Sequence, residues 1–222
     1  MKLVRIAGLI AVTVLSLAVI GQSQGMGGRG GSRAPQMFGA FKPVVGTGAQ
    51  YQATTKARPM EFTYVIVGKE DVEGSAGYWM EIRTSGAEMP GEVVMKELIV
   101  TGGDKPQVKR MIMQSSGRPP MEMPAAMMNM QQRASGGQSA DTDPGVKVGS
   151  ETITVPAGAF DCEHYRKQTK GGPVDVWVSA KVSPYGTVKM TSGEMTMVLE
   201  KMLSNETSHI KGEPQKFEMP KF

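Results

Sequence analysis

Apolar and polar residues alternate along most of this chain, in short runs separated by glycine, proline and acidic residues. Within residues 60–69, for example, Phe62, Tyr64 and Ile66 occupy every second position. A period of two with many β-branched residues is typical of β-strands. The pattern predicts strands at residues 48–56, 60–69, 77–84, 92–101, 107–115, 149–155, 159–168, 174–179, 186–191 and 195–202. A further short strand at the edge of the sheet is predicted at residues 208–211.

These strands follow one another at intervals of about ten residues with turn signals between them, as in antiparallel meanders, barrels and sandwiches. Strands do not alternate with helices, which argues against a parallel sheet. Residues 134–145 are polar and rich in glycine, serine and aspartate, so we expect a disordered loop there. Because each half of the chain has too few strands to close a core alone, residues 41–222 are expected to form a single β domain.

One segment interrupts the strand pattern. Residues 124–133 read PAAMMNMQQR, with proline at a position that suits a first helical turn and good helix formers after it. In a helix, Met127 and Met130 share one stripe and Met128 lies beside it. We expect a short helix with an apolar face that covers the sheet as a lid.

The amino-terminal residues predict export. Lys2 and Arg5 precede an apolar run at residues 6–20, and small residues at Gly21 and Ser23 follow it. This is the pattern of a secretory signal peptide over residues 1–23, followed by a flexible glycine-rich leader over residues 24–40. The apolar run is shorter than a typical membrane-spanning helix, and no second apolar run of this kind follows it. The mature protein is therefore expected in the periplasm or secreted, without stable membrane insertion.

Charge and composition exclude several functions. The formal net charge of +4 becomes +2 without Lys2 and Arg5, and basic residues are interleaved with acidic ones, so nucleic acid is not an expected partner. The two histidines, His164 and His209, belong to no nucleophile–base motif, and no G-x-S-x-G motif occurs. We therefore expect no enzyme and no cofactor. The single Cys162 excludes an internal disulfide, and its thiol is expected to be buried.

Two stretches of the second half resemble a known class of proteins. Residues 151–162 read ETITVPAGAFDC, and residues 175–179 (DVWVS) precede 184–190 (PYGTVKM). The combination resembles uncharacterised exported bacterial proteins of the lipoprotein-carrier-like class, related to outer-membrane lipoprotein sorting. The resemblance implies a mainly β fold: an antiparallel unclosed β-barrel, or half-barrel, of about ten strands. In that class helices cover an apolar concave face, and the resemblance implies no catalytic residue.

Methionine is the unusual component, with nineteen residues that include Met-x-Met pairs. Such side chains can simply fill the core, or they can form an adaptable surface for lipid chains. In the lipid hypothesis the apolar pocket and its lid consist of Met121, Met127, Met128, Met130, Phe62, Tyr78, Trp177 and Val188. Thioethers are also soft ligands for Cu(I). The alternative copper site consists of Met111, Met113, Met121, Met123, Cys162 and His164.

The sequence therefore predicts a non-catalytic periplasmic binding protein for a lipid or a lipidated protein. A Met-rich Cu(I)-binding protein is one alternative, and an envelope protein that acts only through protein contacts at its sheet edges is another.

Overall fold

The computed structural model describes residues 34–55, 58–86, 89, 91–103, 105–128, 142–169, 171–193 and 195–216. The predicted signal peptide, the first part of the predicted leader and residues 134–141 of the predicted loop lie outside the described residues, as does Met130.

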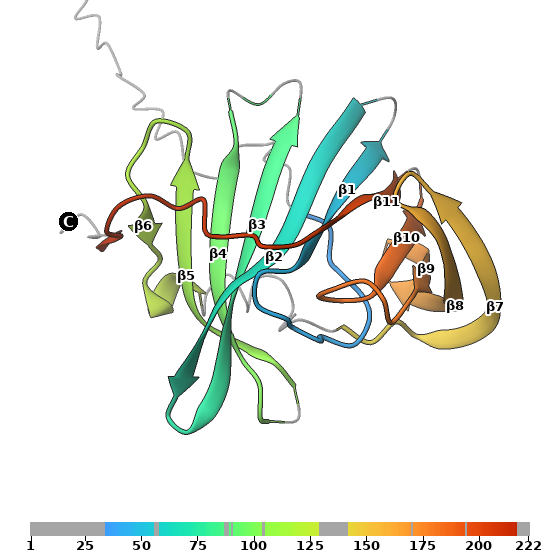
Figure 1. The fold of residues 1–222 in the computed structure, drawn as a ribbon, viewed down its shortest axis with the longest axis horizontal. Coiled ribbons are helices and arrows are strands. Elements are labelled where there is room, and N and C mark those ends of the chain that lie inside the picture. The colour runs from blue at the N-terminus through green and yellow to red at the C-terminus, as the bar shows by residue number, and fades with distance from the viewer. Residues whose placement is uncertain are drawn as a thin grey trace, which may run out of the picture. The chain divides into compact units, whose positions relative to one another are not determined.

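The described residues form one large β-sheet (Figure 1). Its strands are β1 (Gly48–Thr55), β2 (Arg58–Val72), β3 (Ser75–Gly86), β4 (Val93–Val100), β5 (Gln107–Ser115), β6 (Met121–Glu122), β7 (Val146–Val155), β8 (Gly158–Thr169), β9 (Gly172–Val178), β10 (Thr187–Ser192), β11 (Met195–Leu203) and β12 (Gln215–Lys216).

Strands β1–β11 form two antiparallel meanders that meet in the middle of the sheet, and β12 pairs in parallel with β6. The strand order is β12-β6-β5-β4-β3-β2-β1-β11-β10-β9-β8-β7, so the pairing of β1 with β11 joins the meander β1–β6 to the meander β7–β11. β12 and β7 are the two ends of this order, and Figure 1 shows the β7–β11 end curling strongly. Bulges at Ile66/Gly68 and Thr187/Lys189 interrupt the ladders, and such bulges bend strands. The predicted mainly β, antiparallel and unclosed architecture is confirmed.

The predicted strands agree with the observed ones apart from a few residues at their ends. Two very short strands, β6 and β12, were not predicted. The predicted edge at 208–211 is wrong, because these residues cross the sheet instead of extending it, and the amide of His209 donates to the carboxylate of Glu81. Of the predicted helix, residues 125–128 are helical and residues 129–133 lie outside the described residues.

One face of the sheet, the inner face, carries the apolar core. Tyr51 and Tyr64 are fully buried there and pack edge to face at 5.9 Å between ring centroids. Residues 34–42, the inner strap, cover this face: Met37 and Phe38 are buried, and the hydroxyl of Tyr64 donates to the carbonyl of Pro35 over 2.8 Å. The described end of the predicted leader, residues 34–40, is thus part of the packed domain.

The opposite, outer face is crossed by residues 204–211, the outer strap, which is the red segment in front of β2–β5 in Figure 1. Beneath it lie Glu81 and Arg83 of β3, both buried, with 3.0 Å between Arg83 Nε and Glu81 Oε1. Arg83 also donates to Glu206 and to the carbonyl of Thr207, and Glu81 accepts from the hydroxyl of Ser208. The outer strap is therefore held by a buried ion pair and its hydrogen bonds.

A second carboxyl, that of Glu97 on β4, lies on the inner face directly opposite Met80. It makes no hydrogen bond or ion pair within the described part of the chain, and burial raises its pKa to about 7 from an ordinary value of 4.5. The inner face thus holds a carboxyl that loses its proton near neutral pH.

The substitution Arg83→Met should destabilise the protein by about 3–5 kcal/mol, because it leaves the Glu81 carboxylate buried without its cation. Urea-induced unfolding measures this loss. The matched control is Lys147→Met, whose pair with Glu163 has both side chains about half exposed and should cost at most about 1 kcal/mol. Equal losses in the two variants would contradict the assigned role of the outer-face pair.

The substitution Glu97→Gln should remove a pH dependence of stability. The unfolded carboxyl releases its proton near pH 4.5 and the folded one near pH 7, so the folded state holds an extra proton between these values and stability falls as pH rises through this window. At pH 8 the variant should be more stable than the natural protein by roughly 2–3 kcal/mol. Urea unfolding at pH 5 and pH 8 checks this, with Glu61→Gln on the exposed side of β2 as control. Parallel pH profiles for Glu97→Gln and the natural protein would rule it out.

Candidate ligand-binding site

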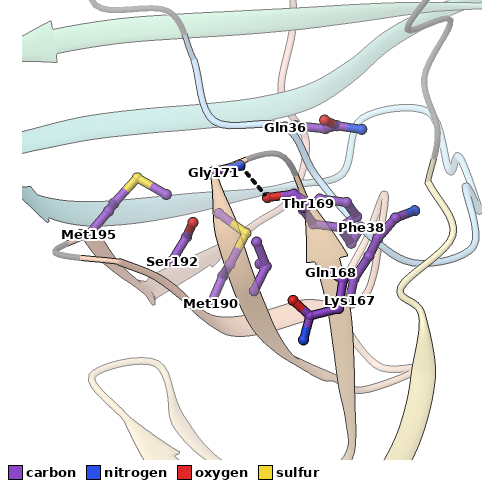
Figure 2. Close-up of a pocket in the computed structure, with 10 residues that line it drawn as sticks. Gln36, Phe38, Lys167, Gln168, Thr169, Gly171, Met190, Ser192 and Met195 are labelled. Atoms are coloured by element: carbon purple, nitrogen blue, oxygen red, sulfur yellow. Dashed lines mark hydrogen bonds between the residues drawn. The ribbon is translucent and has the colours of Figure 1, made fainter.

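The inner strap leaves a recess of about 470 Å³ between itself and the ends of β8, β9 and β10 (Figure 2). The residues that line it come from the inner strap, from the β8–β9 hairpin, and from β10 and the start of β11. They are Gln36, Phe38, Lys167, Gln168, Thr169, Gly171, Val174, Met190, Ser192 and Met195.

Strand register brings these residues together. Lys167 lies directly opposite Val174 in the β8–β9 pair, and Val174 lies opposite Ser192 in the β9–β10 pair, so the three side chains share one face. Met195 begins β11 opposite Ser192. The β8–β9 turn is closed by Thr169, whose hydroxyl donates to the carbonyl of Gly172 over 2.7 Å and accepts from the Gly171 amide.

The recess combines an apolar floor with a cation at its rim. Phe38, Val174 and Met190 are buried, and Figure 2 shows the Met190 thioether in the centre of the site. The Lys167 ammonium lies 5.4 Å from the centroid of the Phe38 ring, donates to the carbonyl of Asp143 over 2.8 Å, and lies 3.9 Å from the carboxylate Oδ2 of the same residue. Such a site suits an apolar chain that ends in an anionic group.

Two further recesses adjoin the inner strap. One of about 260 Å³ lies against residues 34–37 and is lined by Glu97, Tyr64 and Met80, among others. Gln36 lines both this recess and the one in Figure 2, so the strap separates them.

The other recess, of about 630 Å³, lies beside Gly39 and Lys42 and contains the carboxylates of Asp161 and Glu163. Both carboxylates already accept hydrogen bonds, from Thr152 and from Lys147 and Tyr165. This mixture of charges suits an anionic amphiphile less well than the recess at Lys167.

None of the described pocket residues predicted from the sequence lines the recess in Figure 2. Phe62 and Val188 are buried in the core, and Tyr78 is half-buried in edge-to-face contact with Phe41. Trp177 follows the buried Val176 and points to the other side of β9. The predicted lid residues differ in exposure: Met128 is buried, whereas Met121 and Met127 are exposed.

Sequence reasoning missed the residues that do line the recess. Lys167 carried a signal, because it lies on the same side of the predicted strand as Tyr165, and Met195 carried one as a member of a Met-x-Met pair. Phe38 carried none, since it lies in the predicted flexible leader.

The predicted copper ligands fall into two separate groups. Met111 and Met113 lie on β5, and Met121 on β6 pairs directly with Met113. Met123 belongs to the same group, because its amide donates to the carbonyl of Met111. Cys162 and His164 lie on β8, in the other meander.

The Cys162 thiol is buried, 3.4 Å from the carbonyl oxygen of Phe160. Burial and then the nearby Asp161 charge raise its pKa to about 11, so it stays protonated at neutral pH. A buried thiol that keeps its proton at neutral pH is a poor nucleophile.

His164 belongs to a network of carboxylates and an aromatic ring. Its ring stacks on Trp177 with 4.3 Å between centroids, and its Nε2 lies 2.7 Å from Asp175 Oδ1. Burial works to raise the pKa of Asp175, but hydrogen bonds to His164 and Arg166 outweigh it and hold that pKa below its ordinary value. Among the residues with described positions, no group of three or more His, Cys, Asp and Glu side chains is arranged to hold a metal ion.

Within the described ranges, no helix is both long and apolar enough to span a bilayer.

No protein of curated function matches the chain. Among solved structures, a candidate exported protein with YmcC-like fold from Bacteroides fragilis NCTC 9343 is 15% identical, with 74% of this chain and 99% of that chain covered at a TM-score of 0.36. A candidate lipoprotein from Parabacteroides distasonis ATCC 8503 is 13% identical, with 76% and 100% covered at a TM-score of 0.38.

A family model covers most of the sheet just described. It is the model of the domain of unknown function DUF4412, and it matches residues 63–219, from β2 to beyond β12. This match spans more than half of the 222 residues. The chain therefore belongs to the DUF4412 family.

Proposed function

We propose that this protein is an exported, non-catalytic binding protein for a lipid or an acylated partner, whose apolar chain enters the recess at Lys167. The observation that carries the proposal is the recess itself, which has an apolar floor and one lysine at its rim. Its volume of about 470 Å³ lies within the range of about 300–1,000 Å³ that is usual for ligand pockets. Export rests on the predicted signal peptide over residues 1–23.

Energetics favour an amphiphile over a purely polar ligand. Each methylene group that leaves water for the floor of Phe38, Val174 and Met190 contributes about 0.8 kcal/mol. A hydrogen bond from a charged group contributes about 1.5–3 kcal/mol, which Lys167 would supply to a carboxylate or phosphate. The helical residues 125–128 follow β6, and Met127 leaves apolar surface exposed there, but none of these residues lines the recess at Lys167. The non-catalytic assignment rests on the lack of a nucleophile–base motif in the sequence.

Native mass spectrometry of the mature protein, purified gently from a periplasmic extract, tests the proposal directly. We expect a mass excess that dissociates as phospholipid, fatty acid or an acylated peptide. A bare polypeptide mass, together with no binding of added lysophosphatidylglycerol, would overturn it.

The substitution Lys167→Gln should weaken binding of a dansyl-labelled fatty acid about tenfold, because the carboxylate loses a charged donor. Fluorescence titration measures the affinity. The control is Lys201→Gln, an exposed residue of β11 away from the recess, which should leave the affinity unchanged. Equal effects of the two substitutions would point to general charge attraction instead of a site.

The substitution Ser192→Phe should abolish binding by filling the recess with a ring, while it costs at most about 1–3 kcal/mol of stability. Thr196→Phe, at an exposed position of β11, is the size-matched control and should bind normally. Fluorescence titration and urea unfolding of both variants provide the comparison. Undiminished binding by Ser192→Phe would place the ligand elsewhere.

A further inference from the structure

Three methionines lie side by side on adjacent strands at the β6 end of the sheet. Met95 of β4 pairs directly with Met113 of β5, and Met113 pairs directly with Met121 of β6. Residues that face each other in an antiparallel pair project to the same side, with about 4.5–5.5 Å between their Cβ atoms. We refer to Met95, Met113 and Met121 as the methionine row.

The row lies on the inner face, because Met95 is also the direct partner of the buried Ile82. Met95 is half-buried, whereas Met113 is 37% and Met121 40% exposed. Two of the three sulfur-bearing side chains are thus accessible from solvent. Met111 follows on the same side of β5, directly opposite Glu97.

Packing alone explains the row poorly. Methionine is a good filler of irregular gaps inside a core, but Met113 and Met121 are partly outside the core. What the row offers instead is three neutral, soft sulfur atoms on flexible side chains that project to the same side of three adjacent strands. Soft thioethers select Cu(I) over hard divalent cations, and they bind it without first losing a proton.

We propose that the methionine row binds one Cu(I) ion through its three thioether sulfurs. This site differs from the copper site predicted from the sequence: Cys162 and His164 lie on β8 in the other meander, and Met95 takes their place. The inference goes beyond the proposed lipid binding and stands apart from it, because the row contributes no residue to the recess at Lys167.

Anaerobic titration of the mature protein with Cu(I), in competition with the chelator bicinchoninate, tests the site. We expect one equivalent of copper to be retained, and X-ray absorption to show sulfur scatterers. Met113→Leu and Met121→Leu should each weaken retention at least tenfold. Leucine has a similar volume, so thermal unfolding should change little and confirm that the variants fold.

The matched control is Met202→Leu, which changes a methionine that is 48% exposed on β11. It should retain copper like the natural protein. Native mass spectrometry with Ag(I), a soft ion that is not oxidised in air, gives an independent readout and should show one adduct that the row variants lose. Failure to retain Cu(I), or retention that Met113→Leu and Met121→Leu leave unchanged, would overturn the proposal. A loss caused by Cys162→Ser but not by the row variants would also overturn it.

Discussion

The structure depends on covering both faces of one open sheet. On β2 and β3 the inner-facing Tyr64 and Ile82 are buried, but so are the outer-facing Val65 and Glu81. A sheet that does not close cannot bury two faces against itself. This chain covers them with irregular segments from its two ends, the inner strap at residues 34–42 and the outer strap at residues 204–211.

The two straps differ in chemistry, and this difference explains why candidate ligand sites adjoin the inner one. The outer strap is bound through polar groups of fixed geometry, since Ser208 and the His209 amide donate to Glu81. The inner strap combines apolar side chains, such as Met37 and Phe38, with hydrogen bonds that its backbone carbonyls accept, from Tyr64 to Pro35 and from Thr187 to Phe38. An extended segment does not fill the width of the face, so recesses remain beside it.

The strands could be predicted from the sequence because each has enough residues to show its period of two, as β2 and β5 do. β6 and β12 have two residues each and show no period. The outer strap includes a short alternating stretch, but its amides donate to side chains instead of a neighbouring strand: the His209 amide to Glu81 and the Lys211 amide to Gln114.

The candidate sites were less predictable because they depend on register between distant strands. The recess brings Phe38 to Met190, and the methionine row requires that Met95 face Met113 and that Met113 face Met121. Local patterns identify the side of a strand on which a residue lies but not its neighbour across the ladder. The Met-x-Met pairs were visible in the sequence, whereas the partners that make a row of three were not.

The pairing of β1 with β11 has a consequence for the order of folding. Each meander is built from hairpins between consecutive strands, but this pair joins Gly48 to Leu203 across nearly the whole domain. Contacts between residues so far apart in sequence carry a large loop-closure entropy and form slowly. The outer strap follows β11 directly, so its contacts with Glu81 also join residues far apart in sequence. We therefore expect the buried ion pair of β3 to be among the last parts of the domain to leave water during folding.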